Sequence, residues 1–334
     1  MITFFRRLLA LCLTFILLLA MAAAYVVHRT GQELQRPLSI SQPTEWTLNK
    51  GASTIGLANQ WSKQGWIETS FWIKVAVRLD SSLTKIKAGT YELTPGVSVR
   101  QQLEKIIRGE QKAFYLTLVE GETVKQALAR IKAHPKLTLT HTPESLAKLI
   151  DFDGANPEGM LFPDTYQFHL GETDSALLTR AAKRMRTEID AVWKQRANQL
   201  PLKSSYEMVI LASIIEKETG VAAERPLIAS VFVNRLRKGM RLQTDPTVIY
   251  GMGERFDGDI RRQDLREKTP YNTYRINGLP PTPIALVGRE ALEAAARPLD
   301  SNMYYFVAKG DGSHQFSQTL AEHNRAVNQY IRNK

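Results

Sequence analysis

Residues 8–27 form an uninterrupted run of twenty residues without a charge, LLALCLTFILLLAMAAAYVV. At about 1.5 Å of rise per residue, a helix of this length spans about 30 Å, the thickness of the hydrocarbon core of a bilayer. Arg6 and Arg7 precede the run, and only Arg29 follows it closely. This asymmetry predicts a transmembrane helix whose N-terminal tail, residues 1–7, stays in the cytoplasm while the rest of the chain is exported.

A cleavable signal peptide is the competing interpretation, because the alanines at 22–24 would suit a signal peptidase. The run is longer than the usual apolar region of a signal peptide, about 7–15 residues, which favours an anchor. Cys12 lies inside the run behind Leu11 rather than a small residue, which argues against a lipoprotein signal. As the single cysteine of the chain, it also excludes a disulfide framework and a cysteine-rich metal site.

The charge balance narrows the class of partner. The chain has 44 Lys and Arg against 33 Asp and Glu, a formal net charge of +11. Such an excess favours an anionic neighbour, which is a membrane surface, a nucleic acid or an acidic polymer. For an exported domain it argues against nucleic acid and for lipid headgroups or cell-wall material.

The exported part begins with a predicted tether over 28–44, which has two prolines and lacks apolar periodicity. A small module is then predicted over 45–135. In it, strand-like segments at 89–93 and 113–119 precede helices whose N-caps are Ser98 and Thr123. Gly51-Ala52-Ser53 opens a similar turn before an apolar segment. The predicted class is α+β.

This strand, turn and capped-helix unit resembles the LysM fold, which binds N-acetylglucosamine polymers. A structural spacer would have the same pattern, so both interpretations stay open. Trp61, Trp66 and Trp72 would stack on sugar rings in the first case and be buried core residues in the second.

A second, larger α+β domain is predicted over 150–334. Apolar spacing predicts helices over 175–196, 205–219 and 226–238, the last ending at Gly239. The helix over 205–219 reads SYEMVILASIIEKET and carries two inner carboxyl groups, Glu216 and Glu218.

These two carboxyl groups lie about 200° apart around the helix, so they cannot share a face. Glu218 lies in the bulky apolar stripe, whereas Glu216 lies on a smaller and more polar flank. Burial raises the pKa of a carboxyl group, and a general acid working near neutral pH needs a raised pKa. Glu218 is therefore the candidate acid. The alternative is that it ends the helix and is solvated or paired with Arg225.

Polar residues follow in loops rich in glycine and proline, and amides, hydroxyls and tyrosines there are suited to hold sugar hydroxyl and N-acetyl groups. Each would equally serve in a turn or helix cap. The candidate substrate-binding residues are Asn234, Gln243, Asp245, Asn272 and Tyr274. The sequence contains no metal-ligand spacing, phosphate loop, dinucleotide fingerprint or Gly-x-Ser-x-Gly turn, so no metal or cofactor is predicted.

Several motifs of the second domain follow one another in a recognisable order. They are LFPDTY at 161–166, ASIIEKET at 212–219, VFVNRL at 231–236, GMRLQTDPT at 239–247, YNTY at 271–274, GLP at 278–280 and YYFVA at 304–308. With the anchor and the LysM-like module, this order resembles the YceG-like (MltG) family of endolytic murein transglycosylases over nearly the whole chain.

The resemblance implies an enzyme of the cytoplasmic (inner) membrane, single-pass, with its catalytic domain in the periplasm. Such an enzyme cuts nascent peptidoglycan strands internally, near the penicillin-binding proteins that make them, and so terminates their elongation. The family's catalytic glutamate corresponds to Glu218. A lytic transglycosylase needs this one carboxyl group, since the C6 hydroxyl of N-acetylmuramic acid closes the 1,6-anhydro ring.

Two other functions stay open. A muramidase would need a second ionised carboxylate such as Asp245 near the anomeric carbon. A glycan-binding scaffold for a peptidoglycan synthase would need the LysM-like module but not Glu218.

Overall fold

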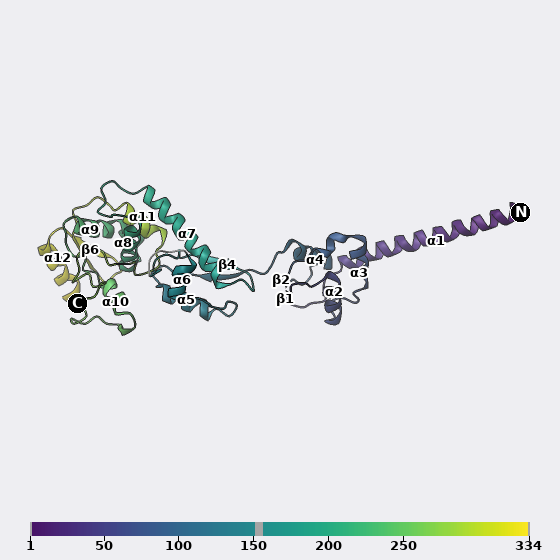
Figure 1. The fold of residues 1–334 in the computed structure, drawn as a ribbon, viewed down its shortest axis with the longest axis horizontal. Helices are drawn as coiled ribbons and strands as arrows, with labels where there is room; N and C mark the ends of the chain where they lie inside the picture. Colours follow the sequence, from purple (N-terminus) through teal and green to yellow (C-terminus); the bar gives the residue numbers. More distant parts are fainter. Residues whose placement is uncertain (1, 151–155, 333–334) are drawn as a thin grey trace. The chain divides into compact units, whose positions relative to one another are not determined.

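The chain folds into two compact units, as the computed structural model shows (Figure 1). The structure describes residues 2–150 and 156–332, so residues 1, 151–155 and 333–334 of the predicted tail and catalytic domain lie outside the described residues. Unit 1 comprises Met1–Phe114 with His169–Gly171, and unit 2 comprises Tyr115–Phe168 with Glu172–Lys334. Helices combined with small two-stranded sheets agree with the predicted α+β class.

The apolar run lies in helix α1 (Ile2–Gln35), the longest helix of the described residues. Within it, Phe4–Gln35 is long and apolar enough to cross a membrane, and its most apolar window is not covered by the rest of the chain. An apolar helical segment that packs on nothing in its own protein is typical of a membrane span rather than of a soluble core.

The predicted tether over 28–44 is wrong in its first part, because α1 continues to Gln35. Glu33 forms ion pairs with Arg29 and Arg36 one turn away on either side, which stabilises the helix there. Leu34 is buried in the core of unit 1, as is Leu38 beyond the helix. The helix ends just before Pro37, and the chain that follows is anchored to the unit rather than loose.

Unit 1 is built on an antiparallel pair of strands, β1 (Thr44–Leu48) and β2 (Gly89–Leu93), with Thr44 opposite Leu93 and Leu48 opposite Gly89. The connection between them holds α2 (Thr54–Lys63), α3 (Phe71–Leu79) and the 3-10 turn η1 (Ser81–Thr84), and α4 (Val99–Arg108) follows. The core includes Leu57, Trp61, Ile73, Leu93, Leu103 and Ile106. Trp61 is fully buried, so a stacking role for it is excluded.

The predicted helix caps are confirmed. The hydroxyl of Ser53 accepts a hydrogen bond from the Gly56 amide at the start of α2. Ser98 and Thr123 each form a reciprocal capping box with a glutamine three residues later, at the starts of α4 and α5 (Val124–Ala133).

The boundary between the units falls after Phe114, inside the predicted module of 45–135. The segment before α5 is tied to unit 2 by backbone hydrogen bonds: the Leu118 amide donates to the Asp164 carbonyl at 3.0 Å and the Gly121 amide to the Leu286 carbonyl at 2.9 Å. Helix α5 therefore belongs with the larger unit although its sequence resembles that of α4.

Unit 2 contains eight described helices and parts of two small sheets. Its first elements are α5, α6 (Pro143–Leu149) and the sheet of β3 (Phe114–Thr117) with β4 (Thr165–Phe168). The next are α7 (Asp174–Lys194), α8 (Ser205–Glu218), η2 (Ala222–Glu224), α9 (Arg225–Arg237), α10 (Asp245–Met252) and η3 (Gly253–Arg255). The last are α11 (Arg289–Ala296), the antiparallel pair β5 (Tyr305–Ala308) and β6 (His314–Ser317), α12 (Leu320–Val327) and a π-helical turn, Asn328–Arg332.

Helix α8 is the centre of unit 2. It contacts α7, α9, α10 and α11, and every residue from Met208 to Ile215 is buried. A helix that is apolar on all sides belongs in the middle of a domain. Its C-terminal end carries Glu218 to the edge of this core, beside the loop that leads into α10.

Candidate active site

Glu218, the last residue of α8, lies in the wall of a cavity of about 440 Å³. This volume is in the range of small-molecule and oligosaccharide sites. Loops and elements from the whole second half of unit 2 contribute to the wall. The lining residues are Glu218, Arg235, Leu242, Gln243, Thr244, Asp245, Tyr274, Tyr305, Phe306, Val307, Leu320, His323 and Val327.

The surroundings of Glu218 raise the pKa of its carboxyl group. Burial is the main cause that raises its pKa to about 7; the nearby charge of Asp245 acts in the same direction, and the Thr244 hydroxyl, which donates to Oε1, acts against it. Thr244 is itself fixed, since its amide donates to the Thr273 hydroxyl at 3.0 Å. Glu218 therefore combines a defined position with a pKa suited to proton transfer near neutrality.

Glu216 differs from the sequence-based expectation of a polar flank. Its side chain is only 4% exposed, and it pairs with Arg225 at 3.1 Å and accepts the Gly288 amide at 2.9 Å. Burial raises the pKa of this carboxyl too, but its oxygens are occupied. Arg225 is therefore the partner of Glu216, and the proposed pairing of Glu218 with Arg225 is wrong.

Three of the five predicted substrate-binding residues line the cavity with Glu218: Gln243, Asp245 and Tyr274. The Tyr274 hydroxyl donates to Asp245 Oδ1 at 2.7 Å, which ties two polar groups together in the wall. Gln243 has a left-handed backbone with a φ of 53°, unusual for a residue with a side chain. Its amide donates to the Thr273 carbonyl at 3.2 Å, so a backbone bond holds this conformation in place.

The other two predicted residues, Asn234 and Asn272, are not brought into the cavity. The Asn234 amide nitrogen donates to the carbonyls of Ser301 at 2.7 Å and Met303 at 3.1 Å. The Asn272 amide nitrogen donates to the carbonyls of Asp264 at 3.0 Å and Glu267 at 2.7 Å. Both side chains are buried and cross-link segments of backbone.

Sequence reasoning missed Arg235 as a residue of the site. Its guanidinium donates to the carbonyls of Tyr304 at 2.6 Å and Leu242 at 2.7 Å, and it lies over the ring of Tyr305 at 5.1 Å. It thus joins α9, β5 and the loop before α10 around the cavity. Arg235 follows the candidate Asn234 in the motif at 231–236, and this position in the motif was the signal that could have found it.

His323, on α12, was also missed. Its ring stacks on Tyr305 with centroids 5.2 Å apart, and burial lowers its pKa, so the ring is neutral at physiological pH. Its Nδ1 is buried and has no hydrogen-bond partner among the described residues. Within the same described ranges, no group of three or more His, Cys, Asp or Glu residues is placed to hold a metal ion.

The residues that line the cavity lie in a region shared with a known protein family. The model of the YceG-like family matches residues 46–329, which contain the whole cavity. The chain belongs to the YceG-like family. The resemblance seen in the ordered motifs is thereby confirmed.

Related proteins are similar to this chain over most of its length. The endolytic murein transglycosylase of Bacillus subtilis is 32% identical in an alignment of 329 residues that covers 91% of this chain and 90% of the relative. That of Streptococcus pneumoniae is 27% identical over 75% of this chain and 52% of the relative. The crystal structure of a YceG-like protein from Listeria monocytogenes is 34% identical and superposes with a TM-score of 0.56, covering 86% of this chain and all of the other.

Proposed function

We propose that this chain is an endolytic murein transglycosylase that cuts peptidoglycan between N-acetylmuramic acid and N-acetylglucosamine and leaves 1,6-anhydro ends. The observation that carries the proposal is Glu218, a carboxyl group with a pKa of about 7 in the wall of an open cavity. The names of the relatives support the class of reaction.

In the first step Glu218 acts as the general acid. Its proton passes to the glycosidic oxygen, the bond from that oxygen to the anomeric carbon breaks, and the N-acetylglucosamine side leaves as an alcohol. The acetamido group of the substrate supports the positive charge that develops at the anomeric carbon. The Thr244 hydroxyl, by donating to Glu218 Oε1, directs the acid proton to the other oxygen, Oε2.

In the second step Glu218, now ionised, acts as the general base. It takes the proton of the muramic acid C6 hydroxyl while that oxygen bonds to the anomeric carbon and closes the anhydro ring. Because the attacking group is already part of the sugar, the step has the advantage of an intramolecular reaction. The proton returns to Glu218 and no water is consumed.

The cavity wall offers polar groups to hold the sugars during these steps. Gln243 and the linked pair Asp245–Tyr274 are assigned to hydroxyl and N-acetyl groups. Arg235 is assigned a positioning role, since its Nε and Nη1 donate to backbone carbonyls.

A hydrolytic muramidase is the second candidate, and one observation favours it. Asp245 lines the same cavity as Glu218 and is exposed, so it is available as a second carboxylate. A hydrolase would use it to activate water or to attack the anomeric carbon.

Mass spectrometry of the new chain ends separates the two reactions. The full chain in detergent would be given uncross-linked glycan strands, with Glu218→Gln as the test variant. Glu158→Gln is the matched control, because Glu158 is a second buried carboxyl group with a pKa of about 7 and lies outside the cavity. We expect the unmodified chain and Glu158→Gln to produce ends that are lighter by one water than hydrolysed ends. Glu218→Gln should produce none. Ordinary reducing ends would establish the muramidase, and cleavage by Glu218→Gln would remove the catalytic assignment.

The proposal also includes where the reaction takes place. With α1 as a single-pass anchor and Arg6 and Arg7 before its apolar run, the catalytic unit would face the periplasm, where nascent strands leave the peptidoglycan synthases. A contact with a penicillin-binding protein, and through it the termination of glycan elongation, belongs to the same proposal.

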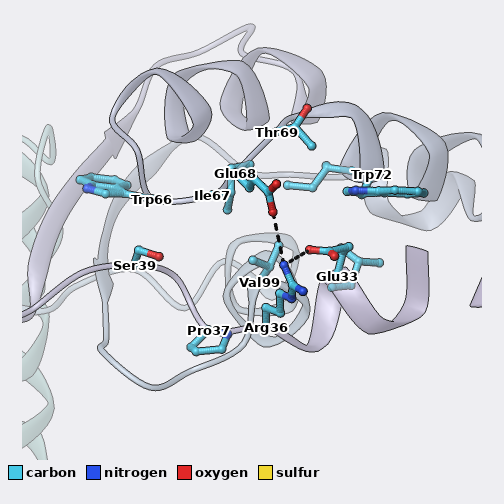
Figure 2. A pocket seen from close by; sticks show the side chains of 12 residues that line it. Glu33, Arg36, Pro37, Ser39, Trp66, Ile67, Glu68, Thr69, Trp72 and Val99 are labelled. Atoms are coloured by element: carbon cyan, nitrogen blue, oxygen red, sulfur yellow. Dashed lines mark hydrogen bonds and ion pairs between the residues drawn. The ribbon is translucent and has the colours of Figure 1, made fainter. Parts of the chain in front are cut away.

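Unit 1 offers a second place for glycan. A cavity of about 210 Å³ is lined by the half-buried rings of Trp66 and Trp72, with Arg36 held between Glu33 and Glu68 (Figure 2). Aromatic faces beside charged groups suit sugar rings, which supports the LysM-like glycan-binding role proposed for this unit. Loss of strand binding in a Trp66→Ala variant that still folds would test it.

A further inference from the structure

Helix α3 lies beside the end of α1, where the chain leaves the proposed membrane span. The two helices are in contact, and the cavity of unit 1 shows which ends meet. Glu33 and Leu34, in the last turns of α1, and Trp72 and Ile73, at the start of α3, line the same cavity (Figure 2).

One face of α1 is covered for some distance before the helix ends. Thr30 is 3% exposed and Val26 is half-buried, although the apolar window before them is uncovered. The start of α3 is level with residues 33–34 and the two helices are in contact, so an α3 that runs antiparallel to α1 would cover Thr30 and Val26. From Trp72 to Leu79 is about 10.5 Å of helix, the same rise as from Glu33 back to Val26. In that arrangement Leu79 would be level with the end of the uncharged run.

The side of α3 that faces away from the core is apolar and exposed. Leu79 is 59% exposed and Phe71 52%, and Val75 between them is half-buried; at intervals of four residues the three lie on one face. The opposite face carries the buried residues Ile73 and Ala76. Two basic residues, Lys74 and Arg78, border the apolar face and bring positive charge to the same level.

We propose that the C-terminal end of α3, with Leu79 and Arg78, docks into the lipid headgroup layer beside α1 and gives unit 1 a second contact with the membrane. The inference rests on the proposed anchor, since the level of Leu79 is set by the uncharged run. Headgroups extend about 5–8 Å beyond the hydrocarbon core on each side, which is the layer that this end of α3 would reach. An apolar side chain next to an arginine is suited to that layer, with anionic lipid as the preferred neighbour.

Lipid-borne quenching in the full chain tests the docking. The protein would be placed in nanodiscs that contain phosphatidylglycerol, with an environment-sensitive fluorophore on single cysteines and a nitroxide quencher near the lipid headgroup. Cys12 itself, in the apolar run, reports the anchor. In a Cys12→Ser background, Leu79→Cys and Phe71→Cys report the two ends of α3. Glu92→Cys, on β2 at the end of unit 1 away from α1 in Figure 1, is the matched exposed control.

We expect quenching at position 79 to exceed that at position 92 by about threefold or more, with position 71 between them, because the headgroup layer is only about 5–10 Å deep. Arg78→Glu should lower the quenching at 79 without changing that at Cys12. If Cys12 is quenched and position 79 behaves like 92, the docking is wrong and the anchor stands. If Cys12 is not quenched, the anchor itself fails. A blue shift at 79 without quenching would mean that protein covers this face, and the inference would be overturned.

Discussion

At the scale of single residues, two buried carboxyl groups of unit 2 share a raised pKa of about 7, Glu218 in the cavity and Glu158 outside it. Glu158 accepts hydrogen bonds from the Val124 amide at 2.8 Å and the Tyr250 hydroxyl at 3.2 Å. In the unfolded chain both titrate near 4.5. Between pH 4.5 and 7 the native state keeps protons that the unfolded state has lost, so each group lowers the stability of the native state as pH rises.

Replacing either group by glutamine removes this penalty. Glu218→Gln and Glu158→Gln are each expected to raise the free energy of unfolding by about 1–3 kcal/mol at pH 8 and to leave it nearly unchanged at pH 4. Denaturant unfolding at the two pH values measures the effect. Equal stabilisation at both pH values would show that charge is not the cause. Only Glu218→Gln should lose activity, by about 10²-fold or more.

The pH dependence of cleavage is the second prediction at this scale. Because Glu218 must carry a proton to act as an acid, activity should fall about tenfold per pH unit above about pH 7. Asp245→Asn removes a negative charge that raises the pKa of Glu218, so the fall should begin at lower pH. Its maximal rate should change by less than about tenfold for a transglycosylase. A loss of about 10²–10⁴-fold would identify Asp245 as the second carboxylate of a hydrolase.

The sequence predicted Glu218 but misjudged its neighbour for a physical reason. The helical pattern shows which side of α8 is bulky, but not what covers the other side. Glu216 is covered by the segment around Gly288, 72 residues further along the chain. Only the folded chain brings this segment and Arg225 to Glu216.

At the scale of elements, Asn234 and Asn272 show why amides in loops are ambiguous. The side-chain amide nitrogen of each donates hydrogen bonds to two backbone carbonyls. For Asn234 the two acceptors lie 67 and 69 residues further along the chain. Asn234→Ala and Asn272→Ala would leave buried carbonyls without donors, so each should lower the free energy of unfolding by about 1–3 kcal/mol. The KM for glycan should stay unchanged at a temperature where the variants are folded, and Gln243→Ala, in the cavity wall, is the contrast that should raise it. A raised KM in a stable Asn234→Ala variant would return this residue to the substrate site.

Elements set by local chemistry were predicted well. The caps at Ser53, Ser98 and Thr123 depend on residues three positions away, and all are present. The strand over 89–93 and the helix 205–219 agree with β2 and α8 to within a residue. The helical end of the predicted tether was missed because Leu34 is buried by contacts far along the chain.

At the scale of the whole molecule, the division into units was placed differently by sequence and structure. The strand and capped-helix pattern groups α4 with α5, whereas the backbone amides of Leu118, Gly121 and Val124 donate hydrogen bonds that tie the start of α5 to unit 2. Similar local sequences thus form parts of two different cores. The structure adds that Glu218 and every residue lining its cavity belong to unit 2.

Two truncated chains test whether the larger unit begins at Tyr115, as in the structure, or after residue 135, as the sequence predicted. A chain of residues 112–334 keeps all of unit 2, and we expect it to fold and to cut soluble glycan strands with a kcat/KM within about tenfold of the full chain. A chain of residues 136–334, cut at the predicted boundary, removes α5 and leaves the Leu286 amide and Glu158 without their partners. It should be less stable by several hydrogen bonds of about 1 kcal/mol each, together with the buried face of α5. Equal stability of the two would favour the predicted boundary. A folded but inactive 112–334 would show that unit 1 supplies substrate binding, and would make Trp66 and Trp72 the next residues to change.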